Sequence, residues 1–356
     1  MSKIHEGILE KAEALMRHLA PKSCRMDWDI ASLREGFDAL TAAGFLGLKR
    51  ADKYGGPAMP EPLFRKFQVA VARGSGALAF LQTQHQSAVS LISKSENESL
   101  KERYLPLMHG PRLVGIGFSQ LRRPGKPLFS AEKVEGGYLL NGNIPWATGF
   151  EFFPEILVGA ALPEDQGVVF AVVPFIQLSG TQGSIEITDR MGLAAMEACS
   201  TVAMNFTNWL VLDEQVVNLL PSDWIHKNDE LNITLQGFFA LGCAWAGYDI
   251  LTEILKKNPN QPAVQDFINR LKFAIETIET KLMDASFGSS DFDKSALRGQ
   301  VIELAFKSAQ GAVVASRGAG VSVEHPAQRV YREAMVFAVS AQTPSIQACT
   351  LETIQF

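Results

Sequence analysis

The sequence has little of several features that would assign it to a specialised class of protein. Its 33 Lys and Arg residues are outnumbered by 38 Asp and Glu residues, which gives a net charge of −5. This balance argues against a nucleic-acid or anionic-membrane surface, because both need concentrated positive charge. No apolar run approaches the roughly 20 residues that cross a bilayer. Residues 1–20 also lack the uninterrupted apolar centre of a signal peptide.

Cysteine is scarce as well. Cys24, Cys199, Cys243 and Cys349 lie far apart, with no Cys-x-x-Cys pair and no zinc-like spacing to histidine. A chain of 356 residues, 47% of them apolar, can build a full core without disulfides. We therefore expect a globular protein of the reducing cytoplasm with no metal site, no membrane contact and no nucleic-acid partner.

The periodicity of the apolar residues changes twice along the chain, which predicts three domains. Over residues 1–111 apolar residues recur every three or four positions, as in Ile8, Ala12 and Leu19, so this part is all-α. Over residues 112–220 the period becomes two, with β-branched and aromatic residues between Gly, Pro and Asn turns, which is typical of an antiparallel barrel or sandwich. The predicted strands are Leu113–Ser119, Phe129–Val134, Tyr138–Ile144, Ile156–Ala161, Val168–Pro174, Ser184–Thr188 and Val202–Thr207.

Helical periodicity returns over residues 221–356. Four long blocks with short connections predict an antiparallel four-helix bundle. The blocks are Asp223–Lys257, Pro262–Phe287, Lys294–Arg317 and Pro326–Thr353.

Several segments, taken in this order, resemble the acyl-CoA dehydrogenase superfamily. FDALTAAGFLGLKRADKYGGPAMP is similar to its amino-terminal stretch, VEGGYLLNGNIPWATG to the strand pair that reaches the flavin, and SRGAGVSVEHPAQRVYREAM to the approach to the last helix. The resemblance implies a helical domain, a middle antiparallel β-barrel and a four-helix bundle, with FAD between barrel and bundle. The cofactor-binding residues that it implies are Phe118, Ser119, Gln120, Trp146, Ala147, Thr148, Gly318, Gly320 and Thr343.

The same resemblance raises a question about the chemistry. The family places a catalytic Glu before a Gly-Thr pair, and Ala341 stands at that position here, two residues before Thr343. Some members carry the carboxylate on the first bundle helix instead, where this chain has Leu235 and Gln236. Removal of an α-proton from a thioester needs a positioned base. Standard desaturation of an acyl-CoA is therefore not expected.

Other residues provide weaker candidates for the chemistry. His85 and Ser340 are the alternative catalytic candidates near the expected substrate pocket. Arg122, Arg123 and Lys126 form a basic loop that either meets phosphates or is a solvated surface.

Three functions remain open at this point. The first is a flavin-dependent oxidoreductase that acts on an unknown small molecule, with an acyl thioester as one option. The second is a non-catalytic oligomeric relative that has lost FAD, and the third is a reduced-flavin-dependent monooxygenase. Under each of them we expect a homodimer or homotetramer, because the apolar segment LQGFFALGCAWAGYDIL must be buried in a bundle or an interface.

Overall fold

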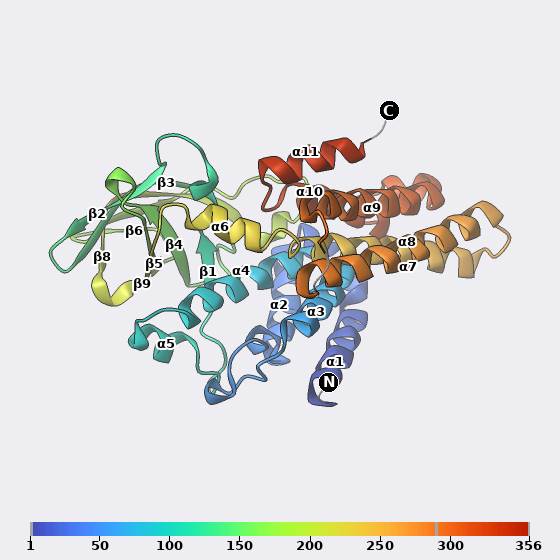
Figure 1. Cartoon of the computed structure of the whole chain (residues 1–356). Helices are drawn as coiled ribbons and strands as arrows, with labels where there is room; N and C mark the ends of the chain where they lie inside the picture. Colours follow the sequence, from blue (N-terminus) through green and yellow to red (C-terminus); the bar gives the residue numbers. More distant parts are fainter. Residues whose placement is uncertain (1–2, 289–290, 355–356) are drawn as a thin grey trace.

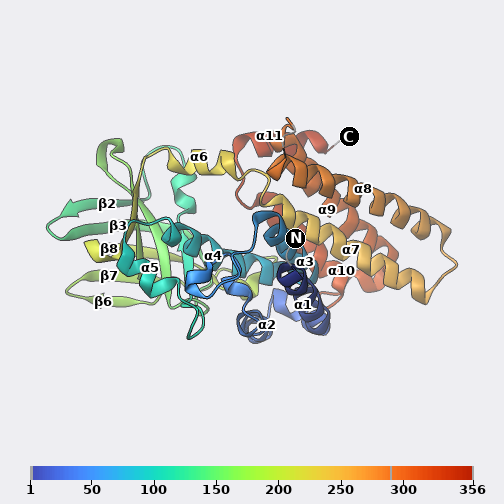
Figure 2. The same cartoon turned by 60° about the horizontal axis from the view of Figure 1, so that its bottom comes forward.

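The structure, a computed structural model, describes residues 3–288 and 291–354, so the outermost residues of the first and last predicted domains lie outside it. A sheet domain lies at one end of the molecule and a long helical bundle at the other, with the N-terminal helices between them (Figures 1 and 2). One hydrophobic core runs through all three parts. The central position of the N-terminal helices lets them contact both the sheet and the bundle.

The N-terminal region is helical, as the sequence predicts. It contains α1 (Lys3–Leu19), α2 (Ile30–Ala42), α3 (Glu61–Gly74), α4 (Gly76–Ser93) and α5 (Glu98–Tyr104). Side chains cap three of these helices at their N-termini, with Asp29 before α2, Ser75 before α4 and Asn97 before α5. The α4 helix is almost fully buried, because it packs on β1 on one side and on α3 and α7 on the other.

The middle region is a single sheet of nine strands within the described residues, in the order β6-β7-β8-β3-β2-β4-β5-β9, with β1 paired to β4. Most pairs are antiparallel as predicted, but β1 and β2 each pair with β4 in parallel. The prediction missed the short strands β6 and β9 and ended β3 and β8 too early. The strands are β1 (Val114–Gly117), β2 (Phe129–Val134), β3 (Gly137–Thr148), β4 (Glu155–Ala161), β5 (Val168–Pro174), β6 (Leu178–Gly180), β7 (Gly183–Ile187), β8 (Thr201–Leu212) and β9 (Val216–Leu220).

The C-terminal region is the helical bundle, with two breaks that the sequence prediction did not include. Its helices are α6 (Trp224–Leu231), α7 (Gly237–Lys257), α8 (Pro262–Phe287), α9 (Lys294–Ala315), α10 (Pro326–Val339) and α11 (Pro344–Thr353). The first predicted block is broken at residues 232–236, and the last at residues 340–343. The second break has a clear cause, because Pro344 cannot continue a helix and the residue before it, Thr343, is extended.

The α7 helix is long and apolar enough to span a membrane by length and composition, although no such run was recognised in the sequence. The apolar composition of α7 also follows from its packing among other helices. It contacts α3, α9 and α10, and its glycines permit close approach, since a Cβ at Gly242 would lie 2.6 Å from the Cβ of Ala72. The helix is therefore the central helix of the bundle.

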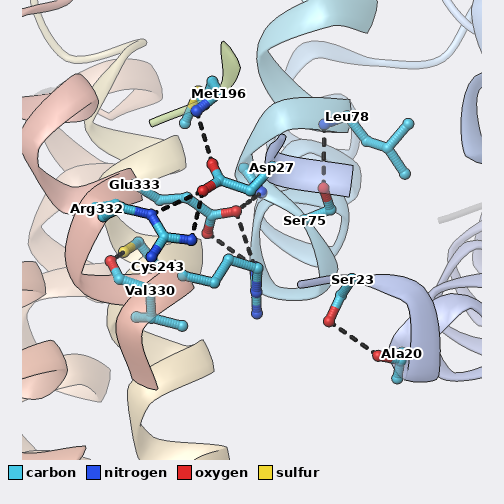
Figure 3. A network of polar contacts seen from close by, with 12 residues as sticks. Ala20, Ser23, Asp27, Ser75, Leu78, Met196, Cys243, Val330, Arg332 and Glu333 are labelled. Carbon is cyan, nitrogen blue, oxygen red and sulfur yellow. Dashed lines mark hydrogen bonds and ion pairs between the residues drawn. The ribbon is translucent and has the colours of Figure 1, made fainter. Parts of the chain in front are cut away.

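A buried polar network joins the N-terminal helices, the sheet domain and the bundle (Figure 3). Glu333 on α10 is fully buried, pairs with Arg329 at 2.8 Å and accepts a hydrogen bond from the backbone N–H of Gly76 at the start of α4. Asp27 accepts one from the backbone N–H of Met196 and pairs with Arg332 at 2.7 Å. The Glu333 carboxylate lies at the N-terminus of α4, where the positive end of the helix dipole stabilises its negative charge. No side chain would fit at Gly76, because a Cβ there would lie 2.7 Å from the Glu333 carboxyl carbon.

Candidate functional site

A cavity of about 1180 Å³ lies where the sheet domain, α4 and the bundle meet. Its walls include Thr83 and Ser87 from α4, Trp146 and Thr148 from β3, and residues of both helix breaks in the bundle. A volume of this size accommodates a drug-sized ligand or a cofactor. We take this cavity as the candidate site.

The sheet contributes Trp146 through a β-bulge. On β3, Ile144 pairs with Met204 and Ala147 with Val202, so three steps on one strand match two on the other. Pro145 lies inside this irregularity, where its missing N–H does not interrupt a ladder bond. The indole of Trp146 remains 48% exposed on the cavity wall, while Ala147 is fully buried.

Thr148 and Gly149 follow on the same strand. The Thr148 hydroxyl lies 3.1 Å from that of Thr201 on β8, and both residues line the cavity. Gly149 has φ of 95°, and a Cβ there would lie 2.2 Å from the ring of Phe153. Any larger residue would clash here, so this turn requires the glycine that follows Trp146, Ala147 and Thr148.

The bundle contributes its two breaks to the opposite wall. Leu235 and Gln236 line the cavity from the break before α7, and Ser340 and Ala341 line it from the break after α10. Ala341 has a positive φ of 47°, and the hydroxyl of Ser340 donates to the carbonyl of Val336 within its own helix. The structure thus brings both positions considered for a base into one cavity, and neither carries a carboxylate.

Two carboxylates line the cavity within the described part of the chain, and each is paired with a cation. Asp229 accepts two hydrogen bonds from Arg122, both at 2.7 Å. Glu61 pairs with Lys49 and with Arg65, the latter at 2.8 Å. Burial raises the pKa of Glu61, but the charges of Arg65 and Lys49 outweigh it and leave that pKa lowered. Both carboxylates are therefore engaged by neighbouring cations.

Positive charge exceeds negative charge around the cavity. Its cationic lining residues, among those described, are Lys49, Arg65, Lys94, Arg122, Arg123 and Arg298. Of the predicted basic loop, Arg122 and Arg123 reach the cavity and Lys126 does not. Such a lining favours a ligand that carries negative charge.

The structure separates the predicted cofactor residues into two groups. Phe118, Ser119, Trp146 and Thr148 line the cavity, although Phe118 also packs edge-on against Phe170 and Trp224. Gln120, Ala147, Gly318, Gly320 and Thr343 are not among the lining residues.

Several of these residues have structural roles instead. Gln120 donates to the carbonyl of Gly159 at 2.8 Å, while its own amide oxygen has no partner. Gly318 and Gly320 lie in the 3-10 helix Arg317–Val321, and Gln328 donates to the Gly320 carbonyl. Thr343 caps α11 by accepting a hydrogen bond from the N–H of Ile346.

His85, the alternative catalytic candidate, is fully buried and does not line the cavity. Its Nε2 lies 3.1 Å from Nη2 of Arg50, and its Nδ1 lies 3.3 Å from the carbonyl oxygen of Val114. A guanidinium only donates, so Nε2 accepts and the ring proton sits on Nδ1, which donates to Val114. Burial, followed by the charge of Arg50, lowers the pKa of His85 to about 3. The ring is therefore a neutral structural group.

Sequence reasoning missed Arg298 on α9. Its side chain is buried, lines the cavity and donates to two backbone carbonyls, those of Ile233 and Ser340. Nothing near it in the sequence marks it, because the two carbonyls lie 65 and 42 residues away. No group of three or more His, Cys, Asp or Glu side chains in the described ranges is arranged to hold a metal ion.

Comparisons with known proteins agree with this architecture, although no family model matches the chain. The chain is 24% identical over 333 residues to a 3-(aryl)acrylate reductase from Clostridium sporogenes, which covers 85% of each chain. It is 22% identical over 326 residues to mitochondrial isovaleryl-CoA dehydrogenase from Solanum tuberosum, covering 85% of this chain and 77% of the relative. These similarities support the resemblance of this chain to the acyl-CoA dehydrogenase superfamily.

A solved structure shares the fold along the whole length of this chain. A glutaryl-CoA dehydrogenase from Mycobacterium smegmatis, solved in complex with FADH2, superimposes with a TM-score of 0.81 at 14% identity, covering 100% of this chain and 95% of the other. The predicted order of helical domain, sheet domain and helical bundle is thereby confirmed.

Proposed function

We propose that this protein is a flavin-dependent oxidoreductase of the acyl-CoA dehydrogenase type that binds FAD in the cavity between sheet and bundle. The observation that carries the proposal is the cavity wall formed by Trp146 and Thr148. A large indole that is half exposed inside a cavity leaves apolar surface for a flat ring to cover. The FADH2 complex of the mycobacterial relative supports the same cofactor.

The chain's own residues fit such a group. Trp146 provides a flat apolar surface, the Thr148 hydroxyl provides a hydrogen-bonding group, and the cationic lining offsets the charge of a pyrophosphate. When bound, FAD supplies hydride transfer. The protein groups then bind and orient the substrate, and the helices around the cavity limit access of water.

We further propose that the reaction is not the standard α,β-desaturation. That reaction requires a base beside the substrate, and Ala341, Leu235 and Gln236 offer none. Glu61 and Asp229 are held by cations, and Glu333 is buried in its pair with Arg329. The clostridial relative, a 3-(aryl)acrylate reductase, is a reductase and not a dehydrogenase, which supports this proposal.

The first experiment is the visible absorption spectrum of the purified protein, before and after incubation with FAD and gel filtration. We expect a retained flavin spectrum, and we expect Trp146→Ala to lose more flavin than Trp28→Ala, which changes an exposed tryptophan outside the cavity lining. A protein that retains no flavin would instead favour the non-catalytic relative. Turnover only with externally supplied reduced flavin and oxygen would favour the monooxygenase.

The second experiment uses Ala341→Glu, which restores a carboxylate at the break after α10. With flavin bound, we expect acyl-CoA-dependent bleaching of the flavin in Ala341→Glu and none in the wild type. Ala341→Gln is the matched control because it has the same size without the charge. Bleaching in the wild-type protein would contradict the proposal that the base is absent.

We also propose that the protein forms a homodimer or a homotetramer. Apolar side chains such as Val314, Val321 and Phe273 are exposed on the bundle surface and suit a subunit contact. Light scattering on the purified protein decides this, and a monomeric mass would contradict it.

A further inference from the structure

Arg298 is a buried cation that has no carboxylate partner in the described part of the chain. Its side chain is 1% exposed, and its two hydrogen-bond acceptors are neutral backbone carbonyls, of Ile233 at 3.1 Å and of Ser340 at 2.9 Å. Its Nε has no hydrogen-bond partner. A buried charge is costly unless an opposite charge compensates it. Burial accordingly lowers the pKa of Arg298 to about 10.

Two other buried arginines have carboxylate partners, which Arg298 lacks within the described residues. Arg329 pairs with Glu333, and Arg65, which also lines the cavity, pairs with Glu61. Arg50 is likewise without a carboxylate, but it is not a lining residue of the cavity. Arg298 is thus both uncompensated and in contact with the space that a ligand occupies.

The position of Arg298 in the cavity is fixed by the two helix breaks. The carbonyl of Ile233 belongs to the break before α7, and the carbonyl of Ser340 to the break after α10. The guanidinium therefore lies between the segments that present Gln236 and Ala341 to the cavity. No side chain in these two segments carries a negative charge.

The lining of the same cavity also includes apolar side chains. Leu231 and Val339 line the cavity with 79% and 69% of their surfaces exposed, and Phe287 lines it as well. A ligand that buries these side chains needs an apolar body. One that compensates Arg298 needs an anionic end, and a carboxylate matches the planar guanidinium.

We propose that Arg298 binds the carboxylate of the substrate, and that the substrate is a carboxylic acid with an apolar body. This proposal rests on the proposed function, since it names the substrate class of the same cavity. A carboxylate from the ligand occupies the place of the missing protein counterion. Its recognition also ties the ligand to both helix breaks through one side chain.

The test is the calorimetric affinity for 3-phenylpropanoate compared with that for 3-phenylpropanamide, which has the same shape without the charge. We expect the wild-type protein to bind the acid at least tenfold more tightly than the amide. We expect Arg298→Met to lose this preference, with unchanged affinity for the amide as evidence that the cavity is intact.

The control is Arg123→Met, which removes another cation of the lining. If general positive charge causes the preference, Arg123→Met reduces it as much as Arg298→Met does, and the proposal is overturned. Equal binding of acid and amide by the wild-type protein overturns it too. Flavin retention is measured on the same samples, so a protein that keeps FAD but shows no preference for the acid contradicts this inference alone. Loss of FAD with an intact preference contradicts only the proposed function.

Discussion

At the scale of single residues, the neighbour of a buried group decides its charge. His85 is surrounded by protein and faces the guanidinium of Arg50, so protonation would place two positive charges side by side without solvent. The folded protein therefore keeps this ring neutral down to a pH near its pKa of about 3, far below the ordinary value of 6.5.

This shift has a consequence for stability. Because the folded-state pKa lies below the unfolded value, the unfolded chain binds the proton first as the pH falls. The contribution of His85 is complete above about pH 6.5 and is lost progressively between about 6.5 and 3, by up to about 1.4 kcal/mol per pH unit. We expect the free energy of unfolding, measured by urea titration, to fall less steeply over this range in His85→Gln than in the wild type.

The comparison needs a control, because many carboxylates also titrate at low pH. His226→Gln removes a histidine from the exposed face of α6 and should keep the steep dependence of the wild type. Identical slopes in His85→Gln and the wild type would rule out the role given to His85.

The residues of the site differ in how far the sequence predicts them. Trp146, Thr148 and Ala341 were found because short segments around them resemble those of a known family, and the structure places all three on the cavity wall. His85 and Gln120 were placed near the site by the same resemblance, yet their partners, Arg50 and Gly159, come from distant segments and bury them. Arg298 was missed for the same reason. Local sequence does not reveal that segments remote in the chain will bury a residue.

At the scale of elements, the break between α10 and α11 is the feature that most affects the site. Ser340 ends one helix, Ala341 adopts a positive φ, and Thr343 begins the next helix as its N-cap before Pro344. The periodicity of the apolar residues continues across this break, which is why the sequence predicted one helix. Proline at the first helical position was the available signal.

The cap at this break can be tested directly. Thr343→Ala removes the oxygen that accepts from the N–H of Ile346, and we expect it to lower the free energy of unfolding by about 1 kcal/mol. Thr343→Ser keeps the oxygen and should stay close to the wild type in the same denaturation experiment. Equal loss in both variants would point to the methyl group instead of the cap.

Strands were predicted where they alternate clearly and missed where they do not. β6 has three residues, Leu178 to Gly180, too few for a pattern. β9 contains the nearly continuous apolar run of Val216 and Val217 before Leu219 and Leu220, interrupted by Asn218. β9 forms a strand because it pairs with β5, and this pairing is a tertiary contact that local sequence does not reveal.

At the scale of the whole molecule, the buried network of Figure 3 connects parts that are remote in sequence. Glu333 is its centre, because it neutralises Arg329 and completes the first turn of α4. Removal of one member of a buried ion pair leaves an uncompensated charge inside the protein.

We therefore expect Glu333→Gln to lower the free energy of unfolding by roughly 3–5 kcal/mol. The matched control is Asp213→Asn, which breaks the exposed pair with Lys133 and should change stability little. Chemical denaturation followed by circular dichroism measures both. A small effect of Glu333→Gln would mean that the network fixes orientation without contributing to stability.

The pairing of Asp27 with Arg332 also has a consequence for the order of events on the ribosome. The two residues are 305 positions apart, so at about 5–20 residues per second the first waits roughly 15–60 s for the second to be synthesised. During that interval the start of α4 and the carboxylate of Asp27 lack their partners from α10. The early helices must therefore remain soluble, or be shielded by a chaperone, until the last part of the chain has emerged.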